Sequence, residues 1–201
     1  MVPGLTGGEK TRPHAARIFF GVYIAEDLRP AASDLQSRLK QAGGRVTWVA
    51  PHNLHFTLQF IGDTPTELIP RLAQAAGEAA ERVSAFTVNV AGVGAFPSPT
   101  RARTLWLGCS RGAAEFGNLA AELSARLHQA GLAEPESRPF AAHCTLGRVR
   151  ERPSGKLITR IEELADTAVG EMSCTRFSLI QSTLTGSGPV YEVLEEFGLP
   201  G

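Results

Sequence analysis

The sequence lacks several features that would assign it to common classes of protein. It has no apolar run of the length that crosses a bilayer, so we expect no transmembrane helix and no membrane association. Its three cysteines, Cys109, Cys144 and Cys174, are odd in number and lack metal-ligand spacing, which favours reduced thiols in a cytoplasmic protein. Neither the Walker nor the dinucleotide-binding glycine spacing occurs, so ATP-driven and nicotinamide chemistry lose their usual sequence support.

An excess of charge of either sign is also missing. Twenty Lys and Arg residues balance twenty Asp and Glu residues. Broad, sequence-independent adhesion to nucleic acid or to an anionic membrane therefore has no electrostatic basis. An anionic ligand would have to be held by a local cluster of donors.

The length and composition indicate one globular domain. The chain has 201 residues, of which 43% are apolar and 20% charged, enough to bury a full hydrophobic core. Residues 1–16, which include His14, are rich in Gly, Pro and polar residues and lack the apolar segment of a secretory signal. We expect a flexible tail over 1–16, followed by a single domain over 17–201.

Hydrophobic periodicity predicts strands mixed with helices. Strands are expected over residues 17–24, 45–49, 54–61, 86–96, 104–109, 142–149, 174–184 and 190–197, the last two as a hairpin. Helices are expected over 27–42, 64–82, 113–130 and 157–166. The second of these starts with a capping box, Thr64-Pro65-Thr66-Glu67, although Pro70 would kink it or delay its start. The pattern indicates an α+β fold with largely antiparallel sheets.

One short motif occurs twice, as His55-Phe56-Thr57-Leu58 and as His143-Cys144-Thr145-Leu146, each within an expected strand. Because side chains alternate across a strand, the His and Thr of each motif would share one face while the residues between them point into the core. If an internal twofold relates the two strands, two imidazoles and two hydroxyls surround one small volume. That arrangement suits a phosphate.

Displacement at phosphorus needs one group that accepts a proton from the attacking oxygen and another that donates a proton to the leaving oxygen. Histidine performs either task near neutral pH. Threonine hydroxyls donate hydrogen bonds to phosphate oxygens, and a guanidinium neutralises the charge that develops. Arg148 is the candidate guanidinium, but in a regular strand it faces away from His143, so a bulge, a twist or the strand end must redirect it.

Simpler interpretations stand beside this one. A single His-x-Thr on a strand is most often structural, and a second copy would rarely arise by chance. His52 and His128 fit surface positions, and a metal site formed by His52, His55 and His143 remains a weaker alternative without a carboxylate at ligand spacing. Aromatic side chains that could stack on a base, but that fit the core better, are Trp48, Phe60 and Trp106.

Several further segments accompany the repeated motif in a fixed order. They are Arg17-Ile18-Phe19-Phe20, Val46-Thr47-Trp48-Val49, Asn53-Leu54, Gly94-Ala95-Phe96-Pro97, Leu105-Trp106-Leu107-Gly108, Arg138-Pro139-Phe140, Gly147-Arg148 and Gln181-Ser182-Thr183-Leu184. With them the sequence resembles the 2H phosphoesterase superfamily, and within it the bacterial and archaeal RNA 2′,3′-cyclic phosphodiesterases of the 2′-5′ RNA ligase family. The likeness covers about residues 17–199.

The resemblance implies an α+β fold of two pseudo-symmetric lobes, each an antiparallel sheet backed by helices, around a central groove. It also implies metal-independent hydrolysis of RNA 2′,3′-cyclic phosphate ends to 2′-phosphomonoesters, without a cofactor. The resemblance makes His55 and His143 the catalytic pair and assigns phosphate binding to Thr57, Thr145 and Arg148. The expected partners are RNA ends or nucleotides that carry a 2′,3′-cyclic phosphate, with no protein partner and a monomeric chain.

Some alternatives remain open within this resemblance. His55 is expected to protonate the departing ribose 3′ oxygen and His143 to activate water, or the reverse. The same site could join 2′-5′ ends, or could bind nucleotides without turnover. Ala142 and Ile180 stand where the family often has Pro and Tyr, which puts substrate preference in question rather than chemistry.

Overall fold

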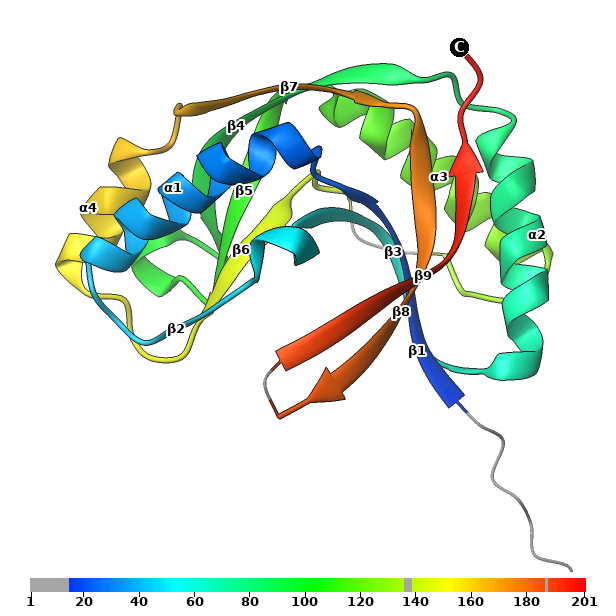
Figure 1. Ribbon diagram of the computed structural model, residues 1–201, viewed down its shortest axis with the longest axis horizontal. Helices are drawn as coiled ribbons and strands as arrows, with labels where there is room; N and C mark the ends of the chain where they lie inside the picture. Colours follow the sequence, from blue (N-terminus) through cyan, green and yellow to red (C-terminus); the bar gives the residue numbers. More distant parts are fainter. Residues whose placement is uncertain (1–14, 136–138, 187) are drawn as a thin grey trace, which may run out of the picture.

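The computed structural model describes residues 15–135, 139–186 and 188–201 (Figure 1). Nine strands in this part of the chain form one sheet, and every pair in it is antiparallel. The order across the sheet is β7-β4-β5-β6-β3-β1-β8-β9, and β2 also pairs with β6. The strands are β1 (Ala15–Tyr23), β2 (Val46–Trp48), β3 (His55–Pro65), β4 (Phe86–Phe96), β5 (Thr104–Arg111), β6 (Cys144–Val149), β7 (Ala168–Cys174), β8 (Arg176–Thr185) and β9 (Gly188–Gly198).

The sheet consists of two halves that meet at one pair of residues. The first lobe contains β9, β8, β1 and β3, and the second contains β6, β5, β4 and β7, with β2 added to β6. Between β3 and β6, as far as the chain is described, only Phe56 and Cys144 are paired. The sheet curls between the lobes in Figure 1. The expected α+β fold with two antiparallel lobes is confirmed.

Four α-helices of the described chain cover one face of this curled sheet. α1 (Arg29–Gln41) and α4 (Gly155–Glu163) pack against the second lobe, whereas α2 (Ile69–Ala80) and α3 (Ala113–Gln129) pack together against the first (Figure 1). α1 follows a strand of the first lobe and α3 follows a strand of the second. Each of these two helices therefore crosses to the opposite lobe, and the two lobes interlock.

A single hydrophobic core lies between the helices and the sheet. The residues that alternate with His and Thr in the two motifs, Phe56, Leu58, Cys144 and Leu146, all belong to it, as predicted. Phe19 and Ile180 pair with each other across β1 and β8 and are also buried, but they lie outside this core. They face the opposite side of the sheet, away from the helices, which we call the open face.

The first strand begins two residues earlier than predicted. Ala15 and Ala16 pair with Pro65 and Thr64 of β3, and Ala16 is buried. Ala15 and Ala16 were predicted to belong to the tail, because their composition resembles that of the tail. Pairing with β3 instead makes them part of the strand. Residues 1–14, and with them His14, lie outside the described residues.

The predicted capping box at Thr64 is wrong. Thr64 is still part of β3 and is buried, and its hydroxyl donates to the carbonyl oxygen of Gly62 at 3.1 Å. A short 3₁₀ turn, Thr66–Leu68, precedes α2, which places Pro70 in the first turn of the helix, where its missing N–H costs nothing. Pairing with β1 extends β3 through a segment whose local sequence favours a helix start.

Strand β7 was not predicted. Only Met172 and Cys174 of its seven residues are buried, and Gly170 interrupts the apolar pattern. The strand forms by pairing with β4 at the edge of the sheet, so its sequence carries a weak signal. No helix in the described ranges is both long enough and apolar enough to span a bilayer.

Candidate active site

The two repeated motifs occupy equivalent places, each at the start of a strand. His55 is the first residue of β3, and His143 directly precedes β6. Thr57 and Thr145 follow on the same face as the histidines, and both are partly exposed. The structure thus presents two imidazoles and two hydroxyls on the open face.

The residue pair that joins the motif strands also joins the two motifs. Phe56 and Cys144 are paired in antiparallel register, and each is the residue directly after a motif histidine. Continuing that register sets His55 beside Thr145 and Thr57 beside His143. The two histidines are also close enough for the charge of His143 to affect the titration of His55. Segments 88 residues apart in the numbering therefore converge on one place.

Both imidazoles are held in the same way. Nδ1 of His55 lies 2.7 Å from the carbonyl oxygen of Asn53, and Nδ1 of His143 lies 2.7 Å from that of Ala141. Because a carbonyl oxygen only accepts, each Nδ1 carries a hydrogen and donates it. Nε2 of each neutral ring is then left with its lone pair, ready to accept a proton. The pair is suited to general acid and base catalysis.

His55 lies in an aromatic enclosure. Its ring contacts Phe19, Tyr23 and Tyr191, with centroid distances of 4.8, 6.0 and 5.4 Å. Burial lowers the pKa of His55 below its usual value, the Asn53 hydrogen bond raises the pKa, and the charge of His143 lowers it. In the free protein the neutral imidazole of His55 is favoured.

Tyr191 brings a hydroxyl to this enclosure. Burial raises the pKa of Tyr191 above its ordinary value, while the charges of Arg148 and Arg17 lower it. The phenol therefore stays protonated at neutral pH and can donate a hydrogen bond. Burial is also the largest cause of the raised pKa of Tyr23.

His143 has a different neighbourhood. The ring of Phe96 meets it edge-on at 5.0 Å and also packs against Trp106 at 5.3 Å. Trp106 pairs with Thr145 in the sheet and lies over Gly94, where a Cβ atom would clash with the indole. The glycine therefore leaves room for the indole beside the second motif. Trp106 lies outside the main core, contrary to the expectation of core packing.

A bulge brings Arg148 to the open face. Trp106 pairs with Thr145 and Leu105 with Gly147, so Leu146 is an extra residue in β6. Beyond this bulge Arg148 pairs with Thr104 of β5 and with Thr47 of β2. Its guanidinium is exposed and acts electrostatically on Tyr191 of the other lobe. The sequence predicted that a strand irregularity must redirect Arg148 toward His143, and this bulge is that irregularity.

The same bulge occurs in the first motif strand. Gly21 pairs with Thr57 and Phe20 with Gln59, so Leu58 is the extra residue of β3. Phe60 then takes the place that Arg148 has in β6. Phe60 is 53% exposed, and the centre of its ring lies 4.9 Å from the guanidinium carbon of Arg17. The expectation that Phe60 packs in the core is wrong, whereas Trp48 does pack against the core.

Sequence reasoning missed Asn53 and Tyr191 as site residues. Asn53 is buried; its carbonyl accepts from His55, and its side-chain amide donates to the carbonyl oxygen of Pro189 at 3.1 Å. That bond ties the tip of the β8–β9 hairpin to the first motif. The sequence holds only two tyrosines, and both contact His55. The rarity of tyrosine in the sequence could have indicated Tyr191. Ile180 had instead suggested that this chain lacks the aromatic residue of the hairpin strand.

The remaining described histidines bear on the alternative of a metal site. His52 and His128 are exposed, as expected. Within the described ranges no three His, Cys, Asp or Glu side chains are grouped so that they could share a metal ion. The combination of His52, His55 and His143 is not such a group.

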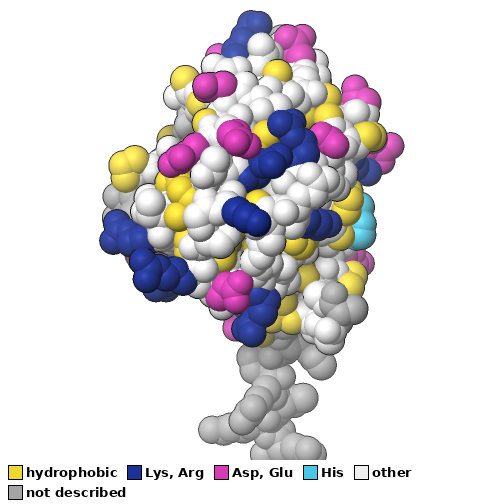
Figure 2. All heavy atoms as spheres, turned by 90° about the vertical axis from the view of Figure 1, so that its left-hand side faces the viewer, with side chains coloured by type: hydrophobic (Ala, Val, Ile, Leu, Met, Phe, Trp, Pro, Cys, Tyr) yellow, Lys and Arg dark blue, Asp and Glu magenta, His cyan; other side chains and the backbone are white. Residues whose placement is uncertain are grey.

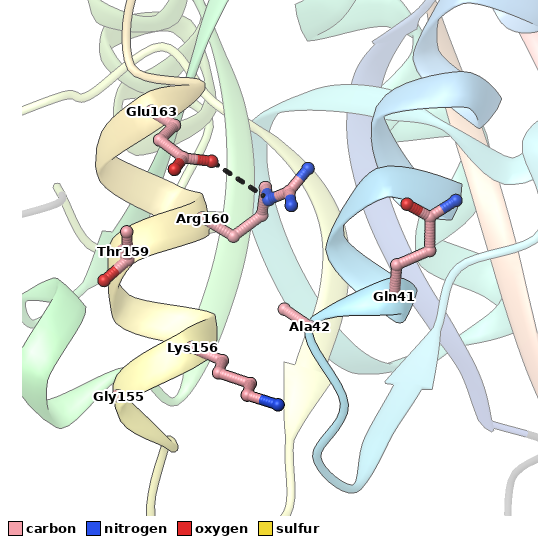
Figure 3. Close-up of a pocket in the computed structure, with 7 residues that line it drawn as sticks. All are labelled: Gln41, Ala42, Gly155, Lys156, Thr159, Arg160 and Glu163. Atoms are coloured by element: carbon pink, nitrogen blue, oxygen red, sulfur yellow. Dashed lines mark ion pairs between the residues drawn. The ribbon is translucent and has the colours of Figure 1, made fainter.

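A separate hollow lies between the end of α1 and α4 (Figure 3). It is lined by Gln41, Ala42, Gly155, Lys156, Thr159, Arg160 and Glu163. Arg160 is already paired with Glu163 at 3.1 Å, and the hollow contains no histidine or cysteine. Basic and acidic side chains are interspersed over the side of the molecule shown in Figure 2, which carries α1 and α4. The motif strands, rather than this hollow, carry the paired histidines of the candidate site.

Comparison with known proteins agrees with the repeat. The model of the LigT-like phosphoesterase family matches the chain twice, over residues 22–106 and 107–191, so that each match contains one His-x-Thr motif. The chain belongs to the LigT-like phosphoesterase family. Each half of the chain that carries one motif thus corresponds to one match of the family model.

Curated relatives of this LigT-like phosphoesterase align over nearly its whole length. The RNA 2′,3′-cyclic phosphodiesterase of Methanothermobacter thermautotrophicus is 36% identical over 184 residues, which covers 91% of this chain and 98% of the relative. That of Aquifex aeolicus is 32% identical over 187 residues, covering 92% and 98%. The family assignment therefore applies to the full domain.

Solved structures share the fold. The crystal structure of TT0787 of Thermus thermophilus superimposes with a TM-score of 0.77 at 29% identity, covering 92% of this chain and 98% of that one. Escherichia coli LigT complexed with 3′-AMP gives a TM-score of 0.72 at 25% identity, covering 92% and 99%. The curled, two-lobed sheet is thus the architecture of this family.

Proposed function

We propose that this protein hydrolyses 2′,3′-cyclic phosphate at RNA ends to a 2′-phosphomonoester, without a metal, and that His55 and His143 are its acid and base. The observation that carries the proposal is the matched pair of imidazoles on one face, each with Nδ1 bound to a carbonyl and Nε2 left for proton transfer. Relatives named RNA 2′,3′-cyclic phosphodiesterase support the substrate, as does the 3′-AMP complex of E. coli LigT.

The reaction is a displacement at phosphorus. One histidine removes a proton from water as its oxygen bonds to phosphorus, and the bond between phosphorus and the ribose 3′ oxygen breaks. The other histidine gives that oxygen a proton. Thr57, Thr145 and Arg148 hold the non-bridging oxygens and offset the charge that builds up on them.

The roles of the two histidines depend on which of them faces the leaving oxygen. We assign the proton donor to His55 and the base to His143. The lowered pKa of His55 favours the reverse assignment, because a base must be neutral before the reaction. The negative charge of a bound phosphate raises the pKa of His55, so its lowered pKa in the free protein does not decide between the two assignments.

The exposed ring of Phe60 offers a surface for the base of the terminal nucleotide. It lies on the open face beyond Thr57, and the Arg17 guanidinium covers one side of it. A nucleobase that stacks on such a ring gains about 1–3 kcal/mol. This contact would favour a nucleotide over a phosphodiester that carries no nucleobase.

The test is an assay on an oligonucleotide with a 2′,3′-cyclic phosphate end, in EDTA, with the product identified as a 2′- or 3′-monoester. We expect EDTA-resistant formation of the 2′-monoester and a bell-shaped pH–rate profile. His55→Ala and His143→Ala should each lower kcat by about a hundredfold or more, because each removes one proton transfer. Full activity in both variants would overturn the assignment.

A second substrate with a better leaving group distinguishes the acid from the base. A phosphodiester with a p-nitrophenyl leaving group needs no proton donor, so it should restore turnover to the variant that lacks the acid and not to the one that lacks the base. His128→Ala, a change of an exposed histidine on α3, is the matched control and should retain wild-type rates. Binding of a 2′-nucleotide without turnover at any pH would instead identify a binding module.

A further inference from the structure

Three arginines line up on the open face beyond the second motif. Arg148 and Arg150 alternate along β6 and its extension, and Arg45 precedes β2 next to them. Thr47 of β2 and Thr104 of β5 flank Arg148 as its sheet partners. We call these five residues the arginine strip.

The hydrogen bonds show that the strip shares one face of the sheet. Thr47 pairs with Arg148, and its hydroxyl accepts from Nε of Arg150 at 3.0 Å, so both arginines lie on the side of Thr47. The backbone N–H of Arg150 donates to the carbonyl oxygen of Arg45 at 2.8 Å, which continues the pairing of β2 with β6. Val46 and Trp48, which alternate with Thr47, pack against the core instead.

The guanidiniums of the strip are not neutralised. Elsewhere in the described chain Arg29, Arg82, Arg126, Arg160 and Arg176 form ion pairs with glutamates. Across the same described ranges no ion pair joins Arg45, Arg148 or Arg150 to a carboxylate, and all three are exposed. Glu151 lies nearby, but its carboxylate accepts the backbone N–H of Arg45 at 2.9 Å.

The other repeat has no such strip. Where β6 has Arg148 and Arg150, the corresponding positions of β3 are Phe60 and Gly62. Three arginines therefore lie on one side of the paired histidines, whereas the other side has an exposed aromatic ring with the single guanidinium of Arg17 over it. Zero net charge over the whole chain makes this local asymmetry the main feature that could orient an anionic polymer.

We propose that the arginine strip binds the phosphodiester backbone of the RNA on the 5′ side of the terminal nucleotide, with Arg45 and Arg150 as its phosphate-binding residues. The inference rests on the proposed function and makes its substrate an oligonucleotide rather than a mononucleotide. Arg150 lies two residues beyond Arg148, a step of about 7 Å along a strand, comparable to the separation of successive phosphates in an extended RNA. Guanidinium and hydroxyl donors together suit phosphate oxygens.

The experiment compares a tetranucleotide with a 2′,3′-cyclic phosphate end and a mononucleoside 2′,3′-cyclic phosphate. We expect wild type to favour the tetranucleotide in kcat/KM. Arg150→Gln should lower kcat/KM for the tetranucleotide roughly tenfold, mainly through KM, because one charge-assisted contact is lost. The same variant should leave the mononucleotide unchanged and reduce the slope of log KM against log salt by about 0.7.

Arg82→Gln is the matched control. Arg82 is an exposed arginine that follows α2 and pairs with Glu122 of α3, away from the open face, so its loss should change kcat/KM for neither substrate. A second measurement does not depend on turnover: the dissociation constant of a tetranucleotide 2′-phosphate should rise roughly tenfold in Arg150→Gln, while that of a mononucleotide 2′-phosphate stays the same. Equal effects on both lengths, or no effect on either, would overturn the proposal. Mononucleotide turnover without a length effect would leave the proposed function intact.

Discussion

At each motif histidine, a backbone carbonyl two residues earlier fixes the ring. The carbonyls of Asn53 and Ala141 hold Nδ1 of His55 and His143, so no carboxylate is needed to orient either ring. The residues that we propose to transfer protons and bind phosphate could be predicted, because the His-x-Thr repeat is local in the sequence. Tyr191 was not predicted, since its contacts with His55 and Phe19 depend on the pairing of β9 with β8 and of β8 with β1.

The buried position of His55 predicts a pH-dependent stability. Its pKa in the folded protein is lowered from an ordinary value of 6.5, so the unfolded chain binds more protons as the pH falls. The contribution is fully present above pH 6.5 and is lost as the pH falls toward the folded pKa. We expect the free energy of unfolding in urea to decrease from pH 7 to pH 5, by about 1.4 kcal/mol for each unit between the two pKa values.

His55→Asn provides the comparison for this effect. The asparagine keeps a donor for the carbonyl oxygen of Asn53 but does not titrate, so its free energy of unfolding should fall less over the same pH range. Equal slopes for wild type and variant would show that His55 does not titrate differently in the folded and unfolded chains.

The elements position the site through two equivalent bulges and one close approach of strands. Leu58 and Leu146 are the extra residues, and they turn Phe60 and Arg148 toward the open face. Periodicity alone cannot reveal a bulge, because the bulge depends on how the neighbouring strand pairs. The close approach is at Gly21 of β1, where the His55 ring lies against the backbone.

Gly21→Ala tests that approach. The added Cβ would fall 2.9 Å from the carbonyl oxygen of Phe56 and 3.2 Å from Cδ2 of His55. The strand or the ring must move, which we expect to cost about 1–3 kcal/mol of stability and to lower kcat by up to about a hundredfold. Urea unfolding and steady-state kinetics measure the two effects.

Gly77→Ala on α2 is the matched control for this change. No atom lies within 4 Å of the added Cβ, so the variant should keep wild-type kcat and gain about 0.5–1 kcal/mol of stability. Wild-type kcat in Gly21→Ala would show that the ring of His55 does not need this glycine.

Over the whole molecule, the two repeats are joined by more than the motif pair. α1 crosses to the second lobe, where the side-chain amide of its Gln36 donates to the carbonyl oxygens of Val49 and Leu146 at 2.8 and 2.9 Å. Its apolar residues Ala32, Leu35 and Leu39 belong to the common core. The crossing helices α1 and α3 are therefore buried against strands of the opposite lobe.

This interlocking predicts that the repeats do not fold separately. Residues 1–106 or 107–201 expressed alone should show no cooperative urea transition by circular dichroism, because each half leaves its crossing helix without a partner surface. Mixing the two halves should restore the cooperative transition. A cooperative transition in either isolated half would show that this repeat folds independently of the other.

The sequence by itself determined the α+β class, the repeated histidine motif and the alternation of core and site residues, because these depend on local spacing and side-chain chemistry. The tertiary structure decided the start of α2, the existence of β7, the direction of Arg148 and Phe60, and the place of Tyr191. Each of these follows from hydrogen bonds between strands distant in the chain, and such bonds override local propensity. The convergence of the two histidines likewise depends on the pairing of Phe56 with Cys144.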